Sequence, residues 1–394
     1  MTFPSRFVRV EAARARFGQR VDRLAPFLLR GDPLADALVA SAAELGAGVG
    51  FRLFARAAAN GIASVPEAPA TFRAFFDETE RVPAWVDAGR MDRGRRLFLR
   101  YGPLAGIVLG GRSLVLGYIS PAGNKPLVFS GRLEEQAPRR LAETGRFVQA
   151  ITEPGAMDVL GEGYQITLKV RYMHAQVRRM IERSGRWNEG AWGRPINQHD
   201  MAGTTLLFSI AVVDGLRTLG ANLSREEADD YLHLWRVIGR LMGVDQEILP
   251  TCEADAFALA DVIAATQEPP DDDARKLTHA LLRTPIETSR TELEKLTGPS
   301  RAAFGAAVTR MLLGDELSDK LALEKNGFLH LLPLVQNATR ARDLVLRVSP
   351  KRRAEAEAAG GRYWRTIVKK SLEGNPADFA PPTDLPLRAV GHPA

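Results

Sequence analysis

Most of the chain carries apolar residues at every third or fourth position, which is the spacing of amphipathic helices. In "VRYMHAQVRRMIERSGRW", residues 170–187, this spacing gives one helical face a single histidine, His174. The other members of that face are apolar: Ile166, Val170, Val177 and Ile181. The side and the opposite face receive the charged residues: Arg171, Arg178, Arg179 and Glu182. A lone histidine on an apolar face is more often a core residue bonded to a backbone carbonyl than a ligand, so this pattern alone favours a structural role.

Helix start and stop signals accompany the periodicity elsewhere. The segment "DPLADALVASAAELGAG" begins with an aspartate that can cap a helix and ends at glycines. The segment "SREEADDYLHLWRVIGRLMG" begins with a capping serine and acidic residues and ends with basic residues and glycine. Alternating runs typical of strands are almost absent. The sequence therefore predicts a mainly α-helical fold.

The helix start and stop signals divide the chain into three parts, which are expected to form one structural domain. Residues 1–90 are predicted to form an N-terminal helical layer, and residues 91–345 contain the longest helical patterns. Residues 346–394 are a basic segment whose Gly/Pro-rich end, from about residue 373, is expected to be extended and poorly ordered.

The charge of the chain does not indicate a nucleic-acid partner. Its net charge is +6, but 53 basic and 47 acidic residues alternate along most of the 394 positions. Only the stretch "PKRRAEAEAAGGRYWRTIVKK" concentrates basic residues. Within it, Trp364, Ile367 and Val368 fit either peripheral membrane contact or, as the favoured alternative, packing against the protein.

Cellular location is expected to be cytoplasmic. The N-terminus lacks the apolar run of a signal peptide, and the longest apolar runs are interrupted before they reach bilayer-spanning length. The single cysteine, Cys252, excludes disulfides within the chain and cysteine-based zinc sites, which fits a reducing compartment.

Familiar catalytic motifs are absent from the sequence. It contains no dinucleotide-binding glycine motif, no P-loop, no H-E-x-x-H and no G-x-S-x-G. The six histidines are scattered singly, so no helical pair of them can chelate a metal. A single imidazole is nevertheless sufficient to hold a haem iron.

Two further segments offer candidate polar groups. In "APRRLAETGRFV", Arg140, Glu143 and Thr144 share a helical face, although this segment alone favours a solvated face with an Arg140–Glu143 pair. In "GRPINQHDMAGTTLLFS", Thr204 and Thr205 lie near the start of an apolar helix, where capping and packing explain most of the pattern.

Six blocks occur in an ordered succession that resembles one known family: "GDPLADALV", "ERVPAWVDAGRMDRG", "SGRL…APRRLAETGRFV", "VRYMHAQVRR", "GRPINQHDMAGTTLLFS" and "YLHLWRVIGRLMGV". This family, of the DUF2236 type, unites bacterial latex-clearing proteins, which are rubber oxygenases, with the fungal oxygenase that trims a farnesyl chain in mycophenolic acid synthesis. The resemblance covers about residues 30–265.

The resemblance implies an all-α fold with a globin-like core around a non-covalent haem b, plus additional N- and C-terminal helices. Rubber oxygenases use O₂ to cleave isoprenoid double bonds, leaving a ketone and an aldehyde. By position, the proximal iron ligand falls on His174, the distal arginine and threonine fall on Arg140 and Thr144, and a further polar position of the pocket falls on Thr204 or Thr205. In this reading, iron is the partner of His174.

Three departures from the family pattern accompany the resemblance. Glu143 stands where rubber oxygenases have a lysine that can cap the iron. Their upstream glutamate, thought to act as a base, has no counterpart, and ungapped spacing leads to Asn124, so Glu143 is the nearest substitute carboxylate. The secretion signal expected of an enzyme that acts on a solid polymer is also missing.

The sequence as a whole predicts a haem b-dependent oxygenase, with O₂ as co-substrate, acting on a small unsaturated isoprenoid or lipid-like molecule. Arg140, Glu143 and Thr144 are its expected catalytic residues, and His174, Arg140, Thr144 and Thr205 its expected haem contacts. Two alternatives stay open: a haem-binding or redox-sensing protein without turnover, and a helical scaffold without cofactor. Substrate identity and oligomeric state are left open.

Overall fold

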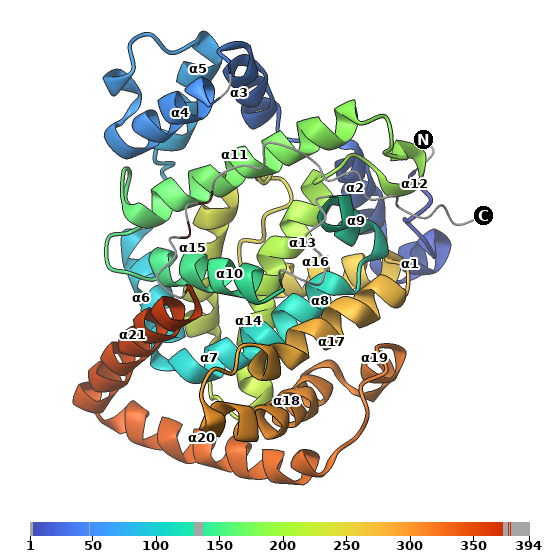
Figure 1. Ribbon diagram of the computed structural model, residues 1–394, viewed down its shortest axis with the longest axis vertical. Coiled ribbons are helices and arrows are strands. Elements are labelled where there is room, and N and C mark those ends of the chain that lie inside the picture. Colours follow the sequence, from blue (N-terminus) through green and yellow to red (C-terminus); the bar gives the residue numbers. More distant parts are fainter. Residues whose placement is uncertain (1–2, 47, 130–136, 373–376, 378, 380–394) are drawn as a thin grey trace.

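In the computed structural model, residues 3–46, 48–129, 137–372, 377 and 379 are described. Every regular element within these residues is a helix, and none is a strand. This finding confirms the all-α prediction, including additional helices before and after the central ones. Figure 1 shows the long α11 (Glu162–Arg183) crossing the molecule, with most other helices packed on one side of it.

The N-terminal helices lie in two places. Helices α1 and α2 and the 3₁₀ turn η1 pack against α16 through Val21, Leu24 and Leu28. Helices α3, α4 and α5 instead cover the outer side of α11, at the top of Figure 1. The elements are α1 (Val10–Phe17), α2 (Gln19–Leu24), η1 (Ala25–Leu29), α3 (Pro33–Glu44), α4 (Val49–Asn60), η2 (Ile62–Ser64) and α5 (Ala70–Glu80).

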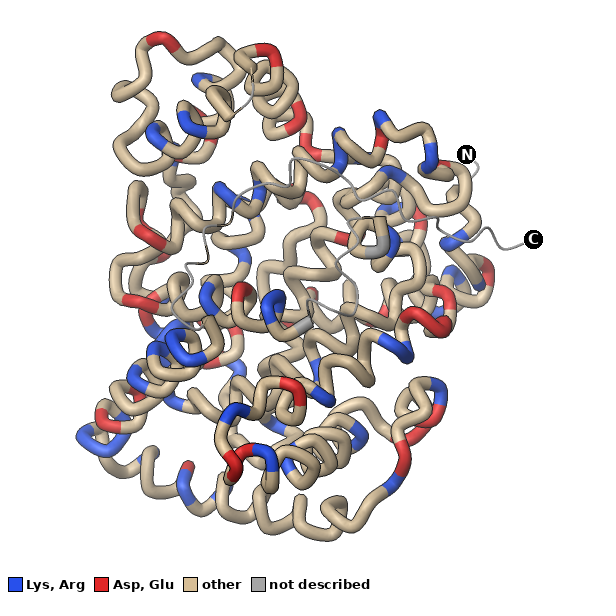
Figure 2. The backbone as a smooth tube through the Cα atoms, in the orientation of Figure 1, with Lys and Arg blue, Asp and Glu red and all other residues tan. Residues whose placement is uncertain are grey.

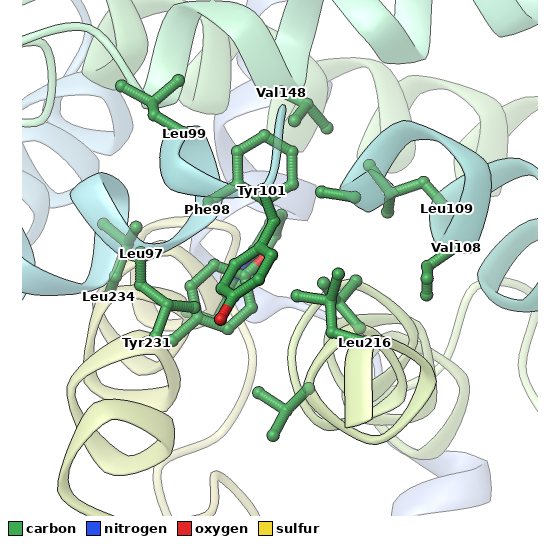
Figure 3. Close-up of a cluster of buried hydrophobic side chains, with 14 of the residues drawn as sticks. Leu97, Phe98, Leu99, Tyr101, Val108, Leu109, Val148, Leu216, Tyr231 and Leu234 are labelled. Carbon is green, nitrogen blue, oxygen red and sulfur yellow. The ribbon is translucent and has the colours of Figure 1, made fainter. Parts of the chain in front are cut away.

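The central helices surround the largest hydrophobic core. Figure 3 shows part of it, with Tyr101 lying among side chains such as Phe98, Leu216 and Tyr231. A Cβ atom on Gly94 would lie 2.5 Å from the carbonyl oxygen of Asp230, so glycine lets two of these helices touch. They are α6 (Ala88–Arg100), α7 (Gly102–Val108), the π-helical turn η3 (Leu109–Ser113), α8 (Leu114–Tyr118), α9 (Pro121–Phe129), α10 (Ala137–Ile151), α11, α12 (Glu189–Trp192), α13 (Gln198–Phe208), α14 (Ile210–Thr218) and α15 (Arg225–Leu241).

The remaining helices follow toward the C-terminus, and the last of them lie at the end of the molecule opposite α3, α4 and α5 (Figure 1). The last helix, α21, packs against α6 so closely that a Cβ atom on Gly360 would lie 1.8 Å from the carbonyl oxygen of Leu99. The set comprises α16 (Glu253–Thr266), α17 (Asp272–Glu287), α18 (Glu292–Leu313), α19 (Asp315–Lys320), η4 (Gly327–Leu331), α20 (Leu332–Val348) and α21 (Pro350–Leu372).

The basic segment at 351–371 packs against the protein rather than facing outward. Trp364 and Val368 are only 6% and 5% exposed and belong to the main core. Trp364 and Val368 are therefore packed as the favoured alternative expects, and peripheral membrane contact of this segment stays a prediction. The predicted extended tail lies almost entirely outside the described residues.

Local sequence signals fixed several helix boundaries as expected. The Asp32 side chain accepts a hydrogen bond from the backbone N–H of Ala35 at 3.2 Å and begins α3. Ser224 and Glu227 form a reciprocal capping box at the start of α15.

One membrane-related finding concerns helix length. Among the described residues, no individual helix is both long and apolar enough to cross a membrane. Two neighbouring segments, Gly102–Tyr118 and Pro121–Leu127, reach the required length and apolarity only when they are taken together, and the chain bends by 101° between them.

Candidate functional site

Helix α11 separates the two largest hydrophobic cores and carries His174. Its Leu168 and Tyr172 pack with the N-terminal helices, whereas Ile166 and Val170 pack with the main core. His174 is enclosed by protein atoms, yet part of the residue remains accessible to solvent. The residue is thus half-buried, with its Nδ1 atom fully inside the protein.

The imidazole of His174 has no hydrogen-bond partner among the described residues. Its Nδ1 atom is fully buried and unpartnered. Burial, assisted by the positive charge of Arg178, lowers the pKa of His174 to about 4, so the ring is neutral and retains a free lone pair. By contrast, Nε2 of His279 lies 3.0 Å from the carbonyl oxygen of Leu321, and His233 accepts a hydrogen bond from a backbone N–H. His174 is therefore not bonded to a backbone carbonyl, and that part of the structural interpretation is wrong.

Two arginines beside His174, which the sequence places to the side of the apolar face or opposite it, are buried. Arg171 and Arg178 are 3% and 1% exposed. Arg171 forms a bidentate ion pair with Asp32, with N–O distances of 2.6 and 2.9 Å. Arg178 pairs with Asp36 and donates to the carbonyl oxygen of Ile196 at 2.8 Å. These two contacts fix α11 against α3 on both sides of the histidine.

Sequence reasoning missed these pairs, although a signal for them was present. The two arginines lie three residues before and four residues after His174, so they form one stripe of the helix that runs beside it. The two aspartates are four residues apart at the start of α3 and therefore face the same way. Matching charge spacing on the two helices indicates a docked pair, which hydropathy alone does not reveal.

On α10, Arg140 and Thr144 continue the buried face formed by Phe147 and Val148. The Arg140 guanidinium carbon lies 6.0 Å from the ring centroid of Tyr118, and the Nη1 atom of Arg140 is buried without a hydrogen-bond partner. Thr144 is half-buried. This face thus presents an unpartnered cationic donor and a hydroxyl toward the interior.

Glu143 has a different neighbour from the one expected. Its carboxylate accepts a hydrogen bond from Nε of Arg139 at 2.8 Å, one helical turn away, and its side chain is 29% exposed. The expected Arg140–Glu143 pair is therefore wrong. The physical reason is that Arg140 is drawn to the face of Tyr118, which leaves Arg139 to bind the carboxylate.

The two threonines of α13 are used within their own helix. Thr204 is exposed and donates to the carbonyl oxygen of Asp200 at 2.9 Å, and half-buried Thr205 donates to that of Met201 at 3.0 Å. Thr205 is therefore the more inward of the two positions that the sequence left open.

Asn124, the position reached by ungapped spacing, is 2% exposed and donates to the carbonyl oxygen of Tyr118. Asn124 thus holds the backbone of Tyr118, the residue whose ring lies under Arg140. Its amide cannot replace the missing carboxylate, because an amide is not acidic.

Four helices converge on the region between these groups. The main core combines Val170 next to His174, Phe147 next to Thr144, and Phe208 from α13 with Trp235 from α15. Ring centroids of Phe147 and Phe208 lie 6.3 and 5.1 Å from that of Trp235. Helices α10, α11, α13 and α15 thus meet in one core beside His174 and Thr144. Arg140 instead lies against Tyr118 of a separate hydrophobic cluster, and Glu143 and Thr204 lie at the margin.

The donor set of this region suits one kind of metal group. No cluster of three or more histidine, cysteine or acidic side chains arranged for a metal ion occurs in the described part of the chain. A neutral, unpartnered imidazole in apolar surroundings is the axial ligand that a haem iron requires from a protein.

Comparisons with known proteins place the chain in a family. The family model for "ER-bound oxygenase mpaB/B'/Rubber oxygenase, catalytic domain" matches residues 99–341, more than half of the chain, and this range includes His174 and Arg140. The chain belongs to this family of oxygenase catalytic domains.

Individual relatives agree with that assignment. A rubber oxygenase from Streptomyces sp. (strain K30) is 27% identical over 270 residues, which are 67% of this chain and 63% of the relative. The solved structure of a latex clearing protein in its closed state shares the fold, with a TM-score of 0.64 and 22% identity over 87% of this chain and 91% of that one.

Proposed function

We propose that this protein binds haem b through His174 and adds O₂ to an unsaturated isoprenoid or lipid-like molecule, with oxidative cleavage of a carbon–carbon double bond. The observation that carries the proposal is the neutral imidazole of His174, enclosed by protein and without a hydrogen-bond partner. Leaving such a group unpartnered costs about 1–3 kcal/mol, which a ligand bound there offsets. Family membership supports an oxygenase reaction.

The residues around His174 fit an axial-ligand role. Arg171 and Arg178 are held by Asp32 and Asp36, so the helix that presents the imidazole is fixed in rotation as well as in position. The positive charge of Arg178 also keeps the ring neutral, which is the form that binds a metal. When bound, haem supplies the activation of O₂.

Polar groups on α10 are assigned to the reacting side. Arg140 has an unpartnered donor and would hydrogen-bond an oxygen atom that gains negative charge during the reaction, an effect that is strong where water is excluded. Thr144 would donate a weaker hydrogen bond and limit the shape of the pocket. Thr205 would line the wall formed by α13. We assign Glu143 no step, because Arg139 holds its carboxylate at the margin.

A second candidate is a haem-binding or redox-sensing protein without turnover. The observation that favours it is the replacement of the upstream glutamate by Asn124 together with the engagement of Glu143 by Arg139. Both candidates place haem on His174, and they differ in whether oxygen is consumed. The cytoplasmic location expected from the sequence stays a prediction.

The test combines an absorption spectrum with an oxygen electrode. Protein reconstituted with haem should show a Soret band and should consume oxygen when polyisoprenoid alcohols or unsaturated fatty acids are added. A Soret band without substrate-dependent uptake across such a panel would support the second candidate. No Soret band would contradict both and return the chain to a scaffold without cofactor.

A further inference from the structure

Helix α20 exposes an apolar stripe along its whole outer face. Leu334, Leu344, Val345 and Val348 are 65%, 65%, 40% and 82% exposed, and Ala338 and Ala341 between them are exposed as well. Scattered apolar residues on a surface are ordinary, whereas a continuous stripe on one helix marks an interaction site.

The orientation of α20 is fixed, so the helix cannot turn the stripe inward. Its inner face buries Leu332, Thr339, Asp343 and Leu346. The carboxylate of Asp343 accepts hydrogen bonds from the Tyr101 hydroxyl at 2.7 Å and from the Asn222 backbone N–H at 2.8 Å. Figure 1 shows α20 along the lower edge of the molecule, where a flat surface can reach it along its length.

Positive charge borders the stripe. Arg340 and Arg347 are exposed, and neither forms an ion pair with a carboxylate of the described residues. Arg342 instead turns toward the protein, where it donates to the carbonyl oxygen of Arg100 and lies over the Tyr101 ring. The only acidic residue of α20, Asp343, is buried. Lys351 and Arg352 follow at once, and Figure 2 shows basic residues at the corner where α20 meets α21.

We infer that α20 is a docking surface for an anionic lipid bilayer. A helix with an apolar face bordered by arginines lies in the headgroup region, where apolar burial and attraction to acidic lipids add together. A second copy of the chain is the other conceivable occupant, because positions 331, 334, 338, 341, 345 and 348 alternate steps of three and four. Pairing two such faces would bring unpaired arginines together without an exposed acid of α20 to oppose them, and this favours the bilayer.

The test is co-sedimentation of the full-length protein with vesicles. Phosphatidylcholine vesicles that contain phosphatidylglycerol should bind the protein at low salt, and pure phosphatidylcholine vesicles should bind it weakly. Val348→Glu and Leu334→Glu should each reduce the partition coefficient about tenfold or more, because each moves a charge into the apolar layer. Replacing both Arg340 and Arg347 by alanine should reduce binding only to the anionic vesicles.

A matched control is Val82→Glu. Val82 is 63% exposed between α5 and α6, away from α20, so this variant should bind as the unsubstituted protein does. Far-ultraviolet circular dichroism checks that all variants are folded. Equal loss in Val82→Glu, or no binding to anionic vesicles, would overturn the inference. A dimer in sedimentation equilibrium that Val348→Glu dissociates, without vesicle binding, would assign the stripe to a second copy. None of these outcomes depends on haem.

Discussion

Helices α10 and α11 face the same core but treat their polar groups in opposite ways. On α11, the arginines beside His174 are buried and paired with Asp32 and Asp36 of α3. On α10, Arg140 is directed inward with an unpartnered donor. The α11 side is fixed by the protein itself, whereas the α10 side leaves a donor free for a molecule that binds there.

This difference has a physical meaning for a site. A buried ion pair contributes little net stability, but it penalises every arrangement in which one partner is lost, and so it defines the position of α11. An unpartnered buried donor is unfavourable in the empty protein, and such exceptions to local rules concentrate at functional sites. Under the proposed function, α11 therefore holds the ligand and α10 contacts the reacting molecule.

The largest expected effect is on stability, from breaking the pair under α11. Asp32→Ala removes the bidentate partner of buried Arg171, which keeps only the more distant Glu78 carboxylate at 3.6 Å, and also removes the cap of α3. The free energy of unfolding should therefore fall by about 3–5 kcal/mol. Urea denaturation measures it. Glu11→Ala, which removes an exposed partner of Arg14, should change stability by less than about 0.5 kcal/mol. A loss below about 1 kcal/mol for Asp32→Ala would mean that α11 is not held by this pair.

On the α10 side the expected effect is on activity instead. Arg140→Ala should retain haem and change the free energy of unfolding little, while substrate-dependent oxygen uptake falls by roughly a hundredfold or more. Arg146, on another face of the same helix and paired with Glu162, provides the control, and Arg146→Ala should keep its uptake. Oxygen uptake at the wild-type rate in Arg140→Ala would contradict the proposed role of Arg140 in the reaction.

In the haem-free chain, burial of His174 should make the free energy of unfolding depend on pH. Its pKa is lowered to about 4 by burial, below the ordinary value of 6.5, so the unfolded chain binds the proton first as the pH falls. The stability contributed by the neutral ring is complete above about pH 6.5 and is lost between about pH 6.5 and 4, by about 3 kcal/mol. Urea titrations of the chain and of His174→Leu should differ in this window by that amount. Parallel pH profiles would show that the ring is solvated.

The smallest effects should come from the remaining α10 groups. Thr144→Val removes one neutral hydrogen-bond donor, worth about 1 kcal/mol, so oxygen uptake should fall severalfold. Glu143→Gln alters only a pair at the margin, and uptake should stay within about twofold of wild type. Steady-state rates with one substrate check both. A loss in Glu143→Gln as large as that in Arg140→Ala would show that the carboxylate leaves Arg139 and takes part in the reaction.

The sequence predicted features that depend on residues close together along the chain, and it missed contacts between residues far apart along the chain. Helix boundaries at Asp32 and Ser224 were predictable because caps act within a few residues. The inward direction of His174 also followed from local spacing, whereas that of Arg140 was expected only from the resemblance to the family. The partner of Arg171 could not be predicted in this way, because Asp32 lies 139 residues away along the chain. The partner of Glu143 could not be predicted either, because Glu143 binds Arg139 only when Arg140 is drawn to Tyr118. The outer face of α20 was missed since periodicity shows that a helix has an apolar side, but not whether that side is covered.

The central claim is that His174 holds a haem iron, and an absorption spectrum of His174→Ala tests it most directly. The unsubstituted protein reconstituted with haem should show a Soret band with one haem per chain. The variant should lose the haem or release it readily to apomyoglobin, with its helix content unchanged. Added imidazole, which can enter the space left by the side chain, should restore the band. Full haem content and an unchanged spectrum in His174→Ala would contradict the account.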